Sequence, residues 1–229
     1  MKRRAAFLLL ILSVSARAQD CVPVNGIGCF RDKPGSETLL VYFRGHLTRP
    51  MEVPPIRGAD WMTRSARDAV DQYDLAAAAD DLNAAMLVIG SSYRGLTRLE
   101  LAQATRRPFS TLFVAAHSGG NVGLADSLPS WGWVDGVVLL DCFYGVEDGR
   151  LDALSAEVRR RLSARPMLCG GFTTPHNEAR HRTFAAGLGD QGGKCRVDAL
   201  PNGHHEAALD RKIVSALAVR RAMLAALAD

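Results

Sequence analysis

Short, unbroken apolar runs alternate along this chain with segments of helical periodicity. Apolar runs that lack in–out alternation are typical of strands buried on both faces of a parallel sheet. Between the runs, apolar side chains recur every three or four residues and so share one helix face. The alternation predicts an α/β fold, with a mainly parallel sheet flanked by helices. The expected strands are residues 39–43, 84–89, 111–116, 134–140 and, more weakly, 167–169 and 195–200, and the expected helices are residues 64–82, 96–107, 151–162 and 209–227.

The net charge of the chain is concentrated at its start. The formal charge of the 229 residues is +4, and residues 1–18 contain four basic residues and no acidic one. Removing these four from the 28 Lys and Arg leaves 24, which balance the 24 Asp and Glu. A neutral remainder gives no general electrostatic reason to expect nucleic acid or an anionic membrane surface as a partner.

Residues 1–18 have the pattern of a secretory signal peptide. Basic residues at the start are followed by the apolar run 5–14, and Ala16 and Ala18 stand where a signal peptidase reads small residues. The alternative is an anchor helix, but ten apolar residues are fewer than the roughly 20 that a membrane span needs. No other stretch is long and apolar enough to span, so we expect an exported protein, periplasmic or secreted, whose residues 19–229 form a single domain.

Export would place the five cysteines in an oxidising compartment, where they can form disulfides. Cys21 and Cys29 flank the short segment CVPVNGIGC and are the expected bridge. Cys142, Cys169 and Cys195 leave one further pair and one odd thiol, and the sequence does not fix which. Because the chain has no Cys-x-x-Cys pair, we expect neither a structural metal nor another cofactor.

A candidate nucleophile follows the apolar run 111–116. The chain continues as His117-Ser118-Gly119-Gly120 and then enters a helical segment, which places a serine at the apex of a strand-to-helix turn. Such a turn strains the serine backbone, requires tiny neighbours and exposes the hydroxyl above the sheet. It also brings the Gly119 amide, at the positive end of the helix, beside that hydroxyl. The alternative is a glycine-rich turn with an incidental serine.

This turn resembles the nucleophile elbow of the α/β-hydrolase superfamily, usually Gly-x-Ser-x-Gly, with Ala116 in place of the first glycine. The later segment VVLLD-x-x-YG, residues 137–145, is similar to one in small exported members of the superfamily. The resemblance implies a serine hydrolase that cleaves carboxylic esters with a Ser-His-Asp triad. Nothing in the chain matches the two strands that often begin this fold, and only one helix fits before the next strand. We therefore expect a short sheet without a cap domain.

The resemblance implies a base after the last strand, usually directly after a glycine. Here Gly203 is followed by His204 and His205, so His204 is the expected base, with His205 as its competitor. The alternative is a pair of solvated loop histidines. No His-Glu-x-x-His spacing supports a metal pair.

The acid is less well defined by the sequence. Most members carry it after the strand that here is residues 167–169, where no carboxylate stands. Asp141, at the end of the run 134–140, gives the chain order Ser118, Asp141, His204 that the superfamily shows. Glu178, or no acid at all, is the alternative to a catalytic Asp141, which could instead cap its own turn.

The resemblance also implies a second oxyanion donor, in addition to Gly119, from the loop after the first central strand. The amide of His46 is the candidate, with Leu47 second, and the alternative is an ordinary turn at Gly45. The pocket is expected to be open, roofed at most by residues 49–63 and by two tryptophans. These are Trp131 and Trp133, whose alternative place is packing at the sheet edge.

Two other functions stay open beside the ester hydrolase. An exported binding protein could keep the hydrolase scaffold without a working acid. A serine peptidase of the same fold would use the same acyl-transfer groups, because these do not distinguish an ester from an amide. An open pocket would admit a small-molecule or a polymeric ester, and nothing in the sequence indicates an oligomeric state.

Overall fold

A computed structural model describes residues 20–45, 59–90, 94–143, 146–172, 175–189 and 195–199. Within these ranges the strands are β1 (Val22–Val24), β2 (Gly28–Arg31), β3 (Thr38–Phe43), β4 (Ala84–Ile89), β5 (Thr111–His117), β6 (Val134–Leu140), β7 (Leu162–Phe172) and β8 (Cys195–Ala199). The helices are α2 (Ala59–Gln72), α3 (Leu75–Asp81), α4 (Arg98–Thr105), α5 (Gly120–Ser127), α6 (Asp148–Arg161) and α7 (Pro175–Gly187), with a short 3-10 turn at Leu128–Ser130.

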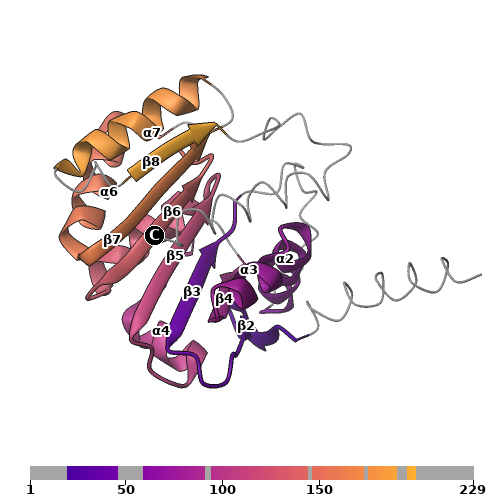
Figure 1. The fold of residues 1–229 in the computed structure, drawn as a ribbon. Coiled ribbons are helices and arrows are strands. Elements are labelled where there is room, and N and C mark those ends of the chain that lie inside the picture. The colour runs from indigo at the N-terminus through magenta and orange to yellow at the C-terminus, as the bar shows by residue number, and fades with distance from the viewer. Residues whose placement is uncertain are drawn as a thin grey trace, which may run out of the picture.

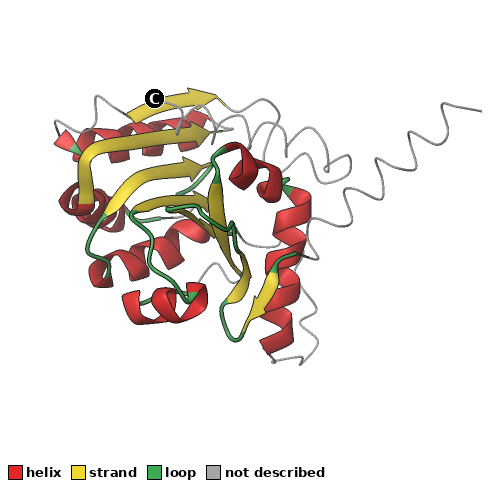
Figure 2. Ribbon diagram, turned by 60° about the horizontal axis from the view of Figure 1, so that its bottom comes forward, coloured by secondary structure: helices red, strands yellow, loops and turns green. Residues whose placement is uncertain are grey.

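The described strands form one sheet in the order β1-β2-β4-β3-β5-β6-β7-β8 (Figure 1). The six strands from β4 to β8 in this order run parallel to one another, and β2 is antiparallel to both β1 and β4. Helices cover the sheet on both sides (Figure 2). The predicted α/β class with a mainly parallel, helix-flanked sheet is therefore confirmed.

Burial on both faces explains why the central strands have unbroken apolar sequences. Along β3, Leu39, Val41 and Phe43 enter one core cluster, and Leu40 and Tyr42 enter the other. The first cluster includes apolar residues of α4, α5, α6 and α7, and the second includes those of α2 and α3. A strand covered by helices on both faces has no solvent side, so it needs no polar alternation.

The two strands at the start of the chain were not expected from the sequence. β1 and β2 form a hairpin closed by the disulfide between Cys21 and Cys29, which confirms that predicted pair. β2 then pairs with β4, from Gly28 opposite Ile89 to Arg31 opposite Met86. The sheet is therefore longer than the short version expected. These strands lack a long apolar run, because β1 is largely exposed and β2 is only half buried.

The helices differ from expectation in three places. The helix predicted over residues 64–82 is divided into α2 and α3, and Asp74 at the break has a left-handed backbone with φ 49°. Because α2 begins at Ala59, the end of the expected loop 49–63 is helical. α7 was not predicted, since its sequence shows no apolar stripe. The helix expected at residues 209–227 lies outside the described residues, as does the expected signal peptide, residues 1–18.

Between β6 and β7, the described residues include a single helix, α6. None of the helices in the described ranges has the length and apolar character needed to cross a lipid bilayer.

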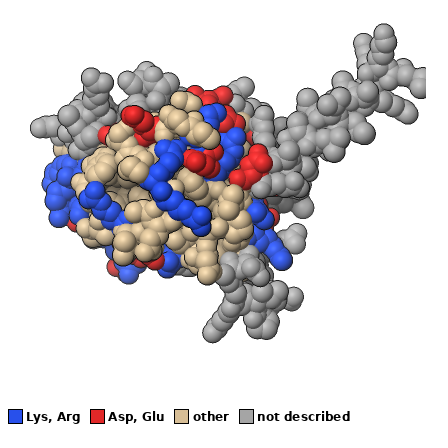
Figure 3. All heavy atoms as spheres, turned by 90° about the horizontal axis from the view of Figure 1, so that it is seen from below, with Lys and Arg blue, Asp and Glu red and all other residues tan. Residues whose placement is uncertain are grey.

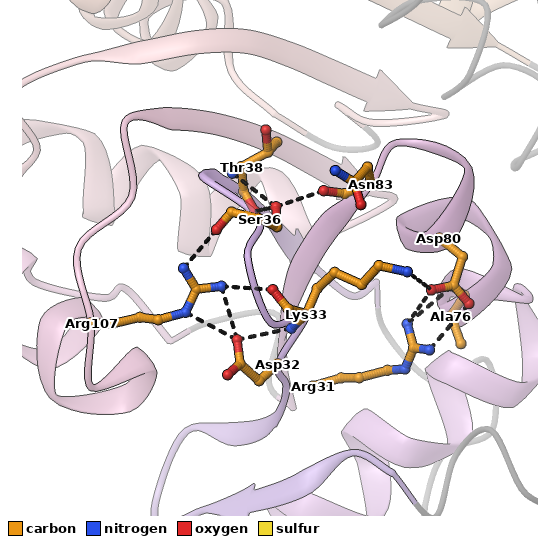
Figure 4. A network of polar contacts seen from close by, with 9 residues as sticks. All are labelled: Arg31, Asp32, Lys33, Ser36, Thr38, Ala76, Asp80, Asn83 and Arg107. Carbon is orange, nitrogen blue, oxygen red and sulfur yellow. Dashed lines mark hydrogen bonds and ion pairs between the residues drawn. The ribbon is translucent and has the colours of Figure 1, made fainter.

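A polar network ties the β2–β3 connection to the rest of the chain (Figure 4). Arg31 donates two hydrogen bonds to Asp80 on α3, at 3.0 and 3.1 Å, and Lys33 donates one at 3.2 Å. On the other side, Arg107 contacts Asp32 at 2.9 Å and the Ser36 carbonyl at 2.6 Å.

Figure 3 shows acidic and basic side chains intermixed on the face seen from below in Figure 1.

Asp80 connects two cations in this network, and its loss should weaken the fold. Partial burial alone would raise the pKa of Asp80, but the hydrogen bonds and charges of Arg31 and Lys33 outweigh it and lower the pKa. The folded state therefore gains stability above the usual carboxyl pKa and loses it as the pH falls below that value. We expect Asp80→Asn to lower the free energy of unfolding by roughly 1 kcal/mol at pH 7.

The measurement is urea unfolding at low and high salt, since salt should reduce the difference. The matched control is Asp152→Asn, because Asp152 is exposed on α6 and has no ion pair among the described residues. Equal stabilities for the two variants would contradict a stabilising role for the Asp80 network.

Candidate active site

Ser118 lies at the predicted strand-to-helix turn, directly after β5 and two residues before α5. Its φ of 51° is in the left-handed region that favours glycine. The Ser118 amide donates a hydrogen bond of 2.9 Å to the carbonyl oxygen of Leu140, the last residue of β6. A left-handed serine costs about 1 kcal/mol or more and persists only where the surrounding structure holds it. The backbone strain expected at this turn is therefore present.

Two glycines allow the backbone to pack closely around the turn. A Cβ atom on Gly120 would lie 2.2 Å from the carbonyl oxygen of Phe43, at the end of β3. A Cβ atom on Gly45 would lie 2.6 Å from the Ser118 Cβ atom and 2.8 Å from the His117 carbonyl oxygen. Because real Cβ contacts are never this short, any side chain at either position would force the ends of β3 and β5 apart.

The close packing also covers the serine. The sequence predicts an exposed hydroxyl, but the Ser118 residue is only 8% exposed. Gly45 packs directly against its Cβ atom, which explains part of this cover.

Gly119 precedes the first turn of α5 and is its N-cap residue, with φ −66°. The first amides of a helix lack helical acceptors and carry the positive end of the helix dipole. The Gly119 amide therefore lies at the positive end of α5, next to Ser118. The proposed second donor, His46, and the alternative Leu47 lie outside the described residues.

The segment after β3 is held by a buried arginine. Arg44 is 6% exposed, and its Nε donates to the Gly45 carbonyl at 3.2 Å. Its Nη1 donates to the carbonyl and to the hydroxyl of Ser65 on α2, and that hydroxyl donates to the Gly90 carbonyl at 2.7 Å. Burial lowers the pKa of Arg44 from its usual value. These contacts fix the backbone of Gly45 where it meets Ser118.

Asp141 directly follows β6, at the same edge of the sheet as Ser118. His117 and Leu140 are paired in adjacent parallel strands, so the residues that follow them are neighbours in space. Asp141 is fully buried and has φ 48°. The side-chain amide of Asn177, on α7, donates to its Oδ1 atom at 2.8 Å.

Glu178, the alternative acid, occupies a different environment. It lies on α7 and accepts two hydrogen bonds from Arg182, at 2.7 and 2.9 Å, in an i,i+4 ion pair. Of the two carboxylates, Asp141 is therefore the one buried at the strand ends. The candidate bases, His204 and His205, lie outside the described residues, so their relation to either carboxylate stays a prediction.

His181 is a buried residue near Asp141 that the sequence analysis missed. It is 1% exposed, lies against the Phe143 ring at 4.9 Å, and its Nε2 atom accepts from the Cys142 amide at 3.2 Å. Burial lowers the pKa of His181 to about 4, with the charge of Asp141 acting in the opposite direction. The only sequence signal was its i,i+4 spacing from Asn177, within a segment that has no apolar pattern.

Cys142 is a free, buried thiol, whose pKa is raised above its usual value by burial and by the charge of Asp141. Of the three cysteines outside the predicted bridge, Cys142 therefore has a free thiol. The side chains of Cys169 and Cys195 lie outside the described part of the chain. Within that part, no cluster of three or more His, Cys, Asp or Glu side chains could hold a metal ion.

The two tryptophans do not roof the site. Trp131 belongs to the hydrophobic core, where its ring lies 6.0 Å from that of Phe43. Trp131 is 3% exposed and donates to the Leu96 carbonyl at 2.7 Å, which agrees with the packing alternative. Trp133 stacks with Arg98 at 5.2 Å. Both line a groove of about 190 Å³ next to α4.

Comparisons of the chain with protein-family models, with curated proteins and with solved structures found no match.

Gly45→Ala should destabilise the chain, because the added methyl group would overlap Ser118 and the His117 carbonyl. Overpacking of this kind costs about 1–3 kcal/mol in the free energy of unfolding, measured by urea denaturation. Gly149→Ala is the matched control. A Cβ at Gly149 meets nothing within 4 Å, and alanine favours helix α6 by up to about 1 kcal/mol. A Gly45→Ala chain as stable as the control would contradict the close approach.

Buried His181 should couple folding to pH. Between its usual pKa of 6.5 and its folded value of about 4, the unfolded chain binds a proton that the folded chain does not. Stability therefore falls as the pH decreases through this range, and the His181 contribution amounts to about 2 kcal/mol between pH 7.5 and pH 5. We expect urea unfolding to show a smaller loss of stability over this range for His181→Gln. Identical pH dependence in the two chains would show that His181 is not buried in its neutral form.

Proposed function

We propose that this chain is a serine hydrolase of the α/β-hydrolase superfamily that cleaves carboxylic esters through an acyl-enzyme. The observation that carries the proposal is the left-handed backbone of Ser118, held at a strand-to-helix turn by Gly45 and Gly120. A strained serine at such a turn is characteristic of the nucleophile in this superfamily. Strained backbone conformations also tend to occur at functional sites.

The architecture supports the same assignment. The sheet order β1-β2-β4-β3-β5-β6-β7-β8, with β2 antiparallel, is the arrangement expected for an α/β-hydrolase that keeps its first two strands. The turn that bears Ser118 follows β5, a central strand of this sheet. Because only α6 lies between β6 and β7 among the described residues, we infer an enzyme without a cap domain at that point.

The proposed chemistry proceeds in two halves. His204 removes the Ser118 proton as the serine oxygen attacks the ester carbonyl carbon, and the charge that develops on the carbonyl oxygen is stabilised by backbone amides. The amides are those of Gly119 and His46. When the bond to the alkoxy oxygen breaks, His204 gives its proton to the leaving alcohol. Water then attacks the acyl-enzyme by the same route, releasing the acid and restoring the serine.

Asp141 is proposed as the acid that orients His204. It is fully buried at the strand end next to Ser118, whereas Glu178 is paired with Arg182 on α7. A buried carboxylate at this position would hold the imidazole in the tautomer that accepts the serine proton and would stabilise the imidazolium. We further infer that residues 1–18 direct export, which agrees with the disulfide near the start of the described chain.

A fluorophosphonate probe tests the proposal, because it reacts with activated serines and not with ordinary hydroxyl groups. We expect the purified chain lacking residues 1–18 to be labelled on Ser118, as identified by peptide mass spectrometry. Ser118→Ala should abolish labelling. Ser110→Ala is the matched control, since Ser110 is an exposed serine just before β5 and should not be needed for labelling.

A well-folded chain that stays unlabelled would count against the hydrolase and favour a binding protein on the same scaffold. If labelling occurs, comparing turnover of short-chain esters with that of peptide amides separates an esterase from a peptidase. Faster turnover of amides would contradict the ester assignment while leaving the nucleophile in place.

A further inference from the structure

Helix α7 presents two buried polar side chains to the turn that follows β6. Asn177 and His181 are 0% and 1% exposed, and they lie one helical turn apart on the same side of the helix. Glu178 and Arg182 form an ion pair elsewhere on α7 and are more exposed to solvent. A helix that buries an amide and an imidazole in place of apolar residues loses hydrophobic stabilisation unless these groups find partners.

One polar atom of each side chain finds a partner in successive residues, while the buried Nδ1 atom of His181 has no hydrogen-bond partner among the described residues. The Asn177 side chain donates to the Oδ1 atom of Asp141 at 2.8 Å, and His181 Nε2 accepts from the Cys142 amide at 3.2 Å. The first contact fixes the carboxylate, and the second fixes the backbone that carries it. Asp141 is thus held from α7 by its side chain and by the peptide that follows it.

These contacts constrain how the carboxylate can be used. A buried carboxylate is costly unless hydrogen bonds stabilise its charged form. The bond from Asn177 provides such stabilisation, and it also sets the rotation of the carboxyl group.

We propose that Asn177 and His181 are positioning residues, which together hold the Asp141 carboxylate in the orientation needed by the catalytic base. The inference rests on the proposed function, because it requires Asp141 to be the acid of the triad. Neither residue touches the reacting atoms, so each acts only through Asp141.

The charged and titratable groups around the pair are consistent with this role. His181 accepts a hydrogen bond through Nε2, which it can do only when that nitrogen is unprotonated, and burial keeps its pKa low. Cys142, the titratable group on the strand side, is kept neutral by its raised pKa. Arg180 on α7 donates to the Val146 carbonyl and lies 3.6 Å from Asp148. Asn177 therefore stabilises the negative charge of Asp141 directly, whereas neutral His181 holds the backbone that follows it.

The first experiment replaces Asn177 with leucine, which has a similar size but no hydrogen-bonding group. The Asp141 pKa, measured by carbon NMR of its carboxyl group, should rise by about one unit, because the charged form loses a hydrogen bond. Fluorophosphonate labelling of Ser118 should become about tenfold slower at neutral pH. Thr183→Ala is the matched control, since Thr183 lies on α7 with its hydroxyl bonded to the Ala179 carbonyl and should change neither measurement.

The second experiment compares two substitutions of His181 and does not depend on whether Asn177→Leu folds. His181→Gln keeps an acceptor for the Cys142 amide and should retain most of the labelling rate. His181→Leu leaves that amide unpaired and should slow labelling severalfold in chains that remain folded by circular dichroism. Rescue by glutamine distinguishes positioning from simple filling of space.

The outcomes separate this inference from the proposed function. Labelled wild-type chain, with an unchanged rate in folded Asn177→Leu or equal rates in the two His181 variants, would overturn the positioning role alone. Wild-type chain that is never labelled, but whose Asp141 pKa still rises in Asn177→Leu, would overturn the hydrolase proposal. The two residues would then serve only to stabilise a buried carboxylate.

Discussion

The close approach of β3 to the turn after β5 is the constraint on which the candidate site depends. Gly45 and Gly120 have no side chains where the backbone of one segment meets the other, and the space left is too small for a methyl group. Ser118 is held between them in a backbone conformation that serine seldom adopts. Arg44 strengthens this arrangement by linking Gly45 to α2 through Ser65. The strained backbone of Ser118 is thus supported by the segment that follows β3, by α5 and, through Arg44, by α2.

A second set of contacts places a charge near that strained serine. Parallel pairing of β5 with β6 brings Ser118 and Asp141 to the same edge of the sheet, and α7 supplies the groups that surround the carboxylate. The pairing of the strands therefore places Ser118 and Asp141 side by side, and a side-chain hydrogen bond from α7 orients the Asp141 carboxylate. The proposed acyl transfer needs this combination, because a nucleophile is useful only with an oriented base and a stabilised charge.

The sequence predicted the features that depend on local pattern. Unbroken apolar runs indicated β3, β4, β5 and β6, and the small residues around Ser118 indicated the strained turn. Features set by tertiary contacts were missed: β1 and β2 owe their pairing to a disulfide and to β4, and α7 shows no apolar stripe because its buried face includes Asn177 and His181. For Trp131 the sequence left a roof and packing at the sheet edge both open, and the structure buries it in the core. The roles of His46 and His204 stay predictions.

The most direct measurement is a crystal structure of the chain after reaction with a phosphonate ester, which mimics the tetrahedral intermediate of acyl transfer. The account predicts a covalent bond from phosphorus to Ser118 Oγ, with the phosphoryl oxygen within hydrogen-bond distance of the Gly119 amide. It also predicts an imidazole from the Gly203-His204-His205 segment between the adduct and Asp141. An unmodified Ser118, or an adduct on another residue, would contradict the account.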